Sequence, residues 1–181
     1  MAHRKKRLLI VDGYNVLSAW QGTAMRGRSG EEIAEARDKL IARLEDYAGY
    51  SGQKVIVVFD AYRSDRQIRT VDRSGALEVV FTQHGETADH YIERLCDEYA
   101  RDVELDRLEI RVATSDGLEQ TVIFGRGAVR MSSRELLYEM EIVRREGNGA
   151  QQVGRSRKAT VMDQLPEDVR RKLEALRREK E

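Results

Sequence analysis

This sequence contains few of the residues that mark secreted, disulfide-stabilised or membrane-spanning proteins. It has one cysteine, Cys96, among 181 residues, which excludes a disulfide framework and favours a reducing, cytoplasmic location. Cys96 falls on the apolar stripe of an expected helix, where a thiol usually serves as a small buried hydrophobe. The first apolar run ends at Asp12, too early for a signal peptide, and no run approaches membrane-spanning length. We therefore expect no membrane partner.

The chain also lacks a net charge, because 32 Lys and Arg balance 32 Asp and Glu. An electrostatic attraction of the whole molecule to nucleic acid is thereby excluded. The charges are nevertheless unevenly distributed: residues 1–30 are basic apart from Asp12, whereas residues 86–109 are strongly acidic. This division fits a basic face around an acidic pocket, and it fits ordinary solvated helices equally well.

Several familiar catalytic motifs are absent. No Gly-x-x-x-x-Gly-Lys-Ser/Thr loop occurs, and no Gly-x-Gly-x-x-Gly follows the first strand, which weighs against an NTPase or a dinucleotide-binding protein. No nucleophile elbow supports Ser-His-Asp hydrolysis. His3, His84 and His90 do not have zinc-ligand spacing with Cys96.

What the chain does contain is an alternation of apolar runs and helical patterns, which is typical of an α/β domain with a mainly parallel sheet. The expected strands are Lys6–Asp12, Lys54–Phe59, Leu77–Phe81, Leu108–Ala113 and a short one at Ala128–Met131. Helix starts are expected at the capping boxes Ser29/Glu32 and Ser132/Glu135, at Thr87, and for a short helix at about Asp116 to Phe124.

The remaining segments have no clear apolar period. Residues 61–75 are expected to form a loop or irregular crossover beside the active edge. Residues 147–160 are polar and glycine-rich, so we expect a linker there, followed by a last helix from Pro166. The predicted organisation is one domain over residues 1–146 and a linker with a helical tail over 147–181.

Acidic residues stand where these apolar runs stop or where a helix begins. Asp12, Asp60 and Asp116 follow the first, second and fourth strands, and Asp89 opens the helix after the third. The carboxyl ends of parallel strands share one edge of the sheet, so we expect these side chains to meet. Each acid alone is explained by helix or loop capping, but four at matched positions repel one another unless a cation neutralises them. We therefore predict a Mg²⁺ or Mn²⁺ site and chemistry on a phosphodiester.

Neighbouring polar residues fit the same site. The amide of Asn15, three residues after Asp12, can bind that carboxylate or a substrate phosphate, and Gly13 would let the backbone turn sharply. Thr114 and Ser115 would place hydroxyl groups near a phosphate. Glu86 is either an outer support of the site or a surface acid. Candidate phosphate contacts lie in the arginine-rich loops, at Arg26, Arg28, Arg63, Arg66 and Arg69.

Taken together, these motifs resemble the NYN family of the PIN-like nuclease superfamily and, within it, the bacterial YacP-like proteins. The matching segments are residues 10–16 (IVDGYNV), 57–61 (VVFDA), 86–89 (ETAD), 113–116 (ATSD) and the late stretch 127–136. The resemblance covers roughly residues 6–146. Each segment is short, and their combination is specific.

The resemblance implies a three-layer α/β/α, PIN-like (Rossmann-like) fold and a metal-dependent endoribonuclease. It assigns the metal to Asp12, Asp60, Asp89 and Asp116, with Asn15 as their polar partner, and it implies RNA decay, in some relatives on translating ribosomes. Two other functions stay open: a non-catalytic RNA- or ribosome-binding module on the same fold, and a small phosphatase, which lacks its usual Asp-x-Asp after the first strand. The oligomeric state is left open.

Overall fold

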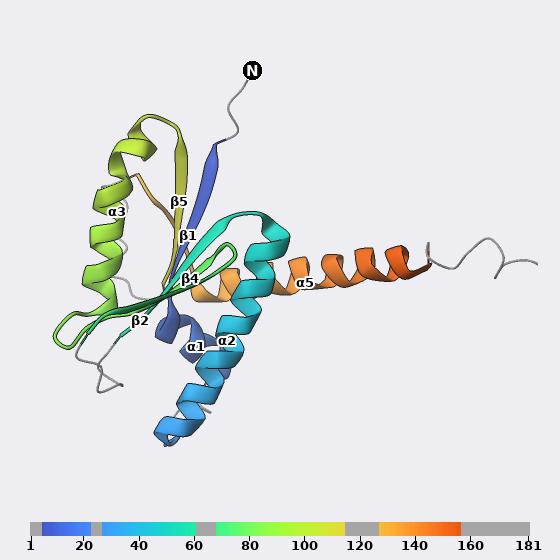
Figure 1. Ribbon diagram of the computed structural model, residues 1–181, viewed down its shortest axis with the longest axis horizontal. Helices are drawn as coiled ribbons and strands as arrows, with labels where there is room; N and C mark the ends of the chain where they lie inside the picture. Colours follow the sequence, from blue (N-terminus) through green and yellow to red (C-terminus); the bar gives the residue numbers. More distant parts are fainter. Residues whose placement is uncertain (1–4, 23–26, 61–67, 115–126, 157–181) are drawn as a thin grey trace, which may run out of the picture. The chain divides into compact units, whose positions relative to one another are not determined.

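A single mixed sheet organises the chain (Figure 1). The computed structural model describes residues 5–22, 27–60, 68–114 and 127–156, with side chains as far as residue 147. The strands are β1 Lys6–Asp12, β2 Lys54–Phe59, β3 Thr70–Ser74, β4 Leu77–Phe81, β5 Leu108–Ala113 and β6 Val129–Met131. Their order is β3-β4-β2-β1-β5-β6; β3 is antiparallel to β4, and the other pairs are parallel. The helices are α1 Gly13–Gln21, α2 Gly30–Ser51, α3 Ala88–Glu104 and α5 Ser133–Ser156.

Both faces of the central strands are buried, as their continuous apolar runs predict. In β1, Leu9 and Val11 pack in one cluster with residues of α1, α2 and the start of α5. Leu8 and Ile10 point to the opposite face and pack in a second cluster with α3. Figure 1 shows α3 on one side of the sheet and α1 with α2 on the other. This arrangement confirms the predicted three-layer α/β/α fold.

Helices begin where the sequence places their caps. The Ser29 hydroxyl accepts a hydrogen bond from the Glu32 backbone at 3.3 Å, and the Glu32 carboxylate accepts one from the Ser29 backbone at 2.8 Å. Thr87 caps α3 by accepting from the His90 backbone at 3.2 Å. Such caps satisfy backbone N–H groups that have no partner within the helix. Within the described residues, no helix combines the length and apolar composition needed to cross a membrane.

A loop or irregular crossover was predicted over residues 61–75, and this prediction was wrong for residues 70–74. Thr70–Ser74 forms strand β3 at the edge of the sheet, joined to β4 by a turn in which Gly75 has φ of +56°. Most of this strand is exposed, so its sequence carries no apolar alternation that would reveal it. Residues 61–67 lie outside the described residues.

The predicted linker was wrong over residues 147–156, because α5 continues to Ser156 through Gly147, Gly149 and Gly154. Glycine in a helix interior costs about 1 kcal/mol relative to alanine, which is why the composition suggested a coil. The chain separates into two units between Arg144 and Arg145. The helices expected at 116–124 and after Pro166 lie outside the described residues, and a separate role for 147–181 stays a prediction.

Candidate active site

Strand register brings three of the predicted polar residues to one edge of the sheet. Asp12, the last residue of β1, pairs with Val58 of β2, which stands two residues before Asp60. On the other side of β1, β5 ends at Ala113, so Thr114 follows at the same edge. The topology therefore confirms that these strand ends are neighbours.

The carboxylate of Asp12 is held at both oxygens by Asn15. Asp12 caps α1, and its Oδ1 accepts a hydrogen bond from the Asn15 backbone N–H at 2.9 Å. Its Oδ2 accepts one from the Asn15 side-chain Nδ2 at 2.8 Å. The same Nδ2 lies 3.4 Å from Oγ1 of Thr114, which is fully buried. The predicted partnership of Asp12 and Asn15 is thus present, and it links β1 to the end of β5.

Asp12 sits in an environment that disfavours a lone negative charge. It is 5% exposed, and burial raises its pKa above the ordinary value of 3.8, an effect that the hydrogen bonds from Asn15 oppose. The negative charge of Asp89 raises the pKa of Asp12 further, so these two carboxylates are close enough to repel. A cation near both oxygens would reverse this balance, because an opposite charge favours the ionised form.

The structure describes Asp60 and Asp89 but not Asp116. Asp89 lies half-buried in the first turn of α3, and Asp60 is half-buried directly after β2. Asp116 and Ser115 lie outside the described residues. Within the described ranges no group of three or more His, Cys, Asp or Glu side chains could hold a metal ion. Oxygen donors such as Asp12 and Asp89 suit Mg²⁺ or Mn²⁺. Because Asp116 is not among the described residues, the four-carboxylate site stays a prediction.

Gly13 serves a purpose that the sequence did not suggest. It begins α1, and it is not among the glycines with positive φ. A Cβ added at Gly13 would overlap the Phe59 ring, which also contacts Tyr14 edge-on at 5.3 Å and stacks on Phe81 at 5.5 Å between ring centroids. The glycine therefore lets the start of α1 pack closely on the end of β2, and Tyr14 packs in the fold.

Glu86 is engaged by two arginines. Arg69 donates to it from Nη2 at 2.6 Å and from Nε at 3.0 Å, and Arg94 lies 2.9 Å away. Although burial opposes it, these hydrogen bonds hold the pKa of Glu86 below its ordinary value. Both guanidinium groups also lie over the ring of Tyr91, at 4.9 and 4.8 Å from its centroid. Arg69, a predicted RNA contact, is thus committed to an ion pair that joins the β3 side of the sheet to α3.

The remaining predicted RNA contacts are described only in part. The guanidinium of Arg28 donates to Gln21 at 3.3 Å, which connects the end of α1 to the start of α2. Arg26, Arg63 and Arg66 lie outside the described residues. Contact of any of these arginines with RNA stays a prediction.

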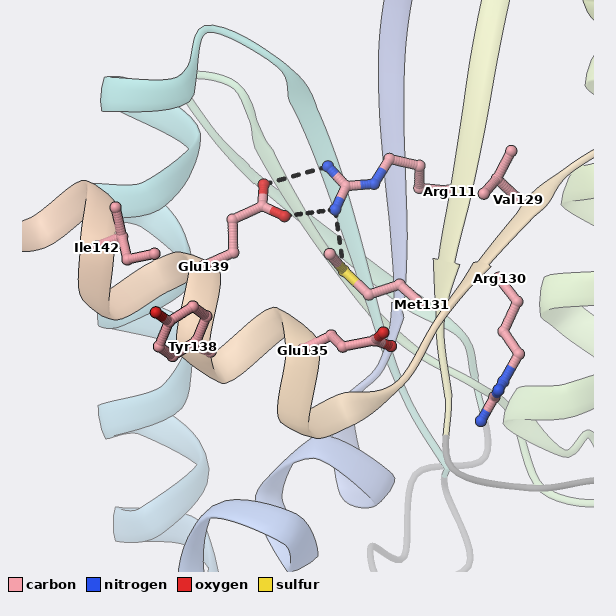
Figure 2. Close-up of a pocket in the computed structure, with 8 residues that line it drawn as sticks. All are labelled: Arg111, Val129, Arg130, Met131, Glu135, Tyr138, Glu139 and Ile142. Carbon is pink, nitrogen blue, oxygen red and sulfur yellow. Dashed lines mark hydrogen bonds and ion pairs between the residues drawn. The ribbon is translucent and has the colours of Figure 1, made fainter.

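Two cavities lie away from the acidic edge. One, of about 910 Å³, is lined by residues at the opposite ends of the strands, including Lys6, Lys54 and Leu108. The other, of about 490 Å³, lies between β6 and α5 and has an apolar rim of Val129 and other exposed side chains (Figure 2). The described residues that line these two cavities include no member of the predicted acidic set, so size alone does not identify the site.

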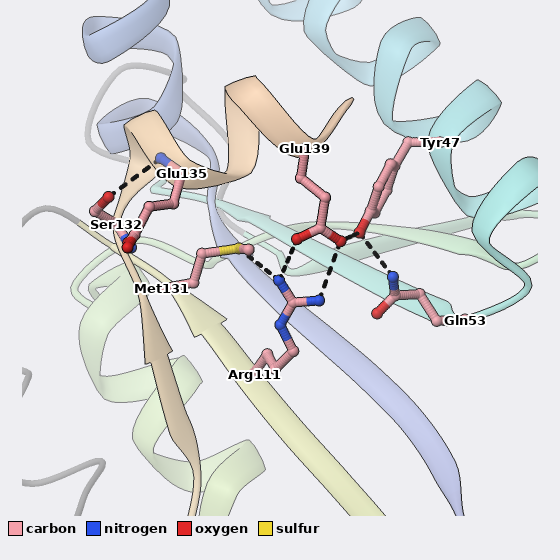
Figure 3. A network of polar contacts seen from close by, with 7 residues as sticks. All are labelled: Tyr47, Gln53, Arg111, Met131, Ser132, Glu135 and Glu139. Carbon is pink, nitrogen blue, oxygen red and sulfur yellow. Dashed lines mark hydrogen bonds and ion pairs between the residues drawn. The ribbon is translucent and has the colours of Figure 1, made fainter. Parts of the chain in front are cut away.

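A polar network holds the start of α5 against β5 and α2 (Figure 3). Arg111 of β5 forms a two-pronged ion pair with Glu139 of α5, and its Nη2 lies 3.2 Å from the Met131 sulfur. The Tyr47 hydroxyl donates to the same carboxylate and accepts from Gln53 at 2.7 Å. The hydrogen bonds from Arg111 lower the pKa of Glu139, while burial and Glu139 raise the pKa of Tyr47. The network fixes the position from which α5 begins.

Sequence reasoning missed a basic cavity that adjoins Asn15. It has a volume of about 450 Å³ and is lined by Asn15, Ser18, Ala19, Arg130, Ser132 and Arg134. Ser132 was identified only as a cap, a role that it does fill by accepting from the Glu135 backbone at 3.2 Å. The available signal was an arginine on each side of that cap: Arg130 in the short strand β6 and Arg134 two residues after the cap.

Comparisons with known proteins agree with the geometry. The family model described as the YacP-like NYN domain matches residues 9–178, well beyond the roughly 6–146 covered by the sequence resemblance. The chain is 42% identical over 138 residues to the protein YacP of Bacillus subtilis (strain 168), covering 76% of this chain and 77% of that protein. The crystal structure of Rae1 (YacP) from Bacillus subtilis is similar with a TM-score of 0.67 and 39% identity, over 94% of each chain. A crystal structure of a point mutant of Rae1 gives 0.66 and 36%, over 94% of this chain and 99% of the mutant.

Proposed function

This chain belongs to the family of YacP-like NYN domains, and we propose that it is a divalent-metal-dependent endoribonuclease. NYN domains are part of the PIN-like nuclease superfamily, so a nuclease or RNA-related function is supported at that level. The observation that carries the finer proposal is the buried Asp12 carboxylate, held at both oxygens by Asn15 and repelled by Asp89. A carboxylate desolvated at a strand edge, beside a second one, is suited to bind a cation.

The proposed reaction is hydrolysis of an RNA phosphodiester. Asp12, Asp89 and Asp116 would hold the metal, with Asp60 assisting from the end of β2. When bound, Mg²⁺ or Mn²⁺ lowers the pKa of a water molecule and stabilises charge on the phosphate. Asn15 keeps the Asp12 oxygens in one orientation, and the Thr114 hydroxyl lies beside that amide. The expected products carry a 5′-phosphate and a 3′-hydroxyl.

The substrate that we propose is mRNA, cleaved in the cytoplasm, with translating ribosomes as a partner that presents it. This part of the proposal rests on the family resemblance alone. The ribosome contributes if cleavage of a translated RNA is fast and cleavage of the same purified RNA is slow. Equal rates with and without ribosomes would contradict this part and leave the nuclease proposal standing.

The nuclease proposal is tested with pure protein and end-labelled RNA, in EDTA and in Mn²⁺. Wild type is expected to cut only with the metal, and Asp12→Asn is expected to be inactive while keeping the fold. Asp102→Asn is the matched control, because Asp102 is exposed and lines the cavity at the opposite ends of the strands. Cutting by Asp12→Asn at the wild-type rate would contradict the mechanism. RNA binding that persists in EDTA, without cleavage in any metal or with ribosomes, would identify a non-catalytic binding module.

A further inference from the structure

The basic cavity beside Asn15 is built from three separate elements. Asn15, Ser18 and Ala19 come from α1, Arg130 from β6, and Ser132 with Arg134 from the start of α5. The Thr114 backbone donates a hydrogen bond to the Met131 carbonyl at 3.1 Å, which fixes the end of β6 against the catalytic edge. The Arg111–Glu139 ion pair holds α5 in place behind it. The cavity is therefore supported by ordered strands and helices.

The lining of this cavity is positively charged, with the Glu135 carboxylate within electrostatic reach of Arg130. Arg130 and Arg134 are both exposed, and neither makes a hydrogen bond or ion pair with any residue in the described part of the chain. This distinguishes them from Arg69 and Arg111, whose guanidinium groups are occupied by carboxylates. Figure 2 shows Arg130 pointing away from the pair formed by Arg111 and Glu139. None of the described side chains that line the cavity is acidic.

The two arginines are the lining groups best suited to an anion. The Ser132 hydroxyl is engaged in capping α5, because it accepts from the Glu135 backbone and its hydrogen bond to the Glu135 side chain lowers the pKa of that carboxyl. The Asn15 amide continues the cavity to the Asp12 carboxylate, 2.8 Å away. Arginine forks match phosphate oxygens with paired N–H donors, and such charge-assisted bonds are the stronger class of hydrogen bond. The lining thus offers two cationic side chains next to the amide that holds Asp12.

We propose that this cavity binds the backbone phosphate of a single RNA strand next to the phosphate that is cleaved, with Arg130 and Arg134 as its cationic contacts. The inference rests on the proposed nuclease function and adds the path of the substrate. A volume of about 450 Å³ lies in the range of about 300–1,000 Å³ usual for a site of small-molecule size. A site of that size accommodates about one nucleotide unit of a flexible strand.

The test separates binding from cleavage. Arg130→Glu/Arg134→Glu is made in the Asp12→Asn background, and binding of a fluorescent single-stranded RNA is measured at several salt concentrations. We expect at least a tenfold weaker Kd and a salt dependence reduced by about 1.4 in log–log slope, since each phosphate contact on a single strand contributes about 0.7. Lys6→Glu/Arg107→Glu is the matched control, because both residues line the cavity at the opposite ends of the strands. It is expected to change the Kd less than threefold.

Two further measurements complete the test. In the active enzyme the double arginine variant should raise KM at least tenfold with kcat within about threefold, and Arg134→Lys should recover part of the loss. Arg130→Gln/Arg134→Gln replaces the reversal variant if circular dichroism shows that the latter does not fold. An unchanged Kd in both double arginine variants, an equal loss in the control, or equal competition by duplex RNA would overturn the proposal. If wild type cuts no RNA, the nuclease proposal fails, while the binding data still decide the role of this cavity.

Discussion

Asn15 donates two hydrogen bonds to Asp12, one to each carboxylate oxygen, from its backbone and from its side chain. The second link also approaches Thr114, so one amide connects the ends of β1 and β5. An aspartate held in this way cannot rotate freely, and its burial makes an unneutralised charge unfavourable. The site is therefore organised before any ligand arrives, around a carboxylate that gains from a nearby cation.

Removing the Asn15 amide should impair catalysis more than folding. We expect Asn15→Ala to lower kcat/KM by about 10- to 100-fold, the usual cost of losing a group that orients a metal ligand. Rates measured across Mn²⁺ concentrations should show that excess metal recovers part of this loss. Asp102→Ala, an exposed position at the opposite ends of the strands, is the control. Wild-type kinetics in Asn15→Ala would contradict an orienting role.

The metal-free protein should be more stable without the Asp12 charge. Because the folded-state pKa of Asp12 is raised, its ionisation opposes folding once the pH exceeds the ordinary value of 3.8. Asp12→Asn in EDTA is therefore expected to have a higher Tm than wild type at pH 7. The difference should shrink as the pH falls towards 4, where the unfolded chain also becomes protonated. A lower Tm for Asp12→Asn at neutral pH would show that the carboxylate is not electrostatically unfavourable.

A methyl group at Gly13 should disturb the packing between α1 and β2. The added Cβ of Gly13→Ala overlaps the buried ring of Phe59, and overpacking of a core costs about 1–3 kcal/mol. Urea unfolding would measure this loss in the free energy of unfolding. Combining the change with Phe59→Leu should recover part of it, whereas simple additivity of the two losses would exclude a direct clash.

Glu139 should stabilise the fold in a pH-dependent way. Arg111 lowers its pKa below the ordinary value of 4.5, so the ionised carboxylate contributes stability that is complete above that value. This contribution is lost as the pH falls through the lower, folded-state pKa. Glu139→Gln should cost about 1–2 kcal/mol at pH 7, the order of a charge-assisted hydrogen bond that is partly exposed. A gap from wild type that stays constant down to pH 3 would contradict the ion pair.

Local sequence signals predicted the parts of the fold that depend on burial and capping. The continuous run Val55–Phe59 predicted a strand, which the structure buries, and Ser29 with Glu32 marked a helix start. The edge strand Thr70–Ser74 was not predicted, because most of its side chains are exposed and its sequence therefore shows no apolar alternation. The helix through Gly147 was missed because composition there argues against it.

For the site, strand-end position predicted which acids share an edge, since parallel topology follows from the alternation of strands and helices. Asp12 and Asn15 met as expected because they are three residues apart at a strand-to-helix turn. The pairing of Arg69 with Glu86, and the cavity that Arg130 and Asn15 both line, depend on how separate segments pack together. Spacing along the chain does not encode such contacts.

The most direct measurement is a calorimetric titration of Mn²⁺ into the metal-free protein, its Asp12→Asn and Asp89→Asn variants, and Asp102→Asn as a control. The account predicts that wild type and the control bind the ion with the same Kd, and that each of the other two variants binds it at least tenfold more weakly. Equal affinity in all four proteins would contradict the claim that Asp12 and Asp89 share a cation.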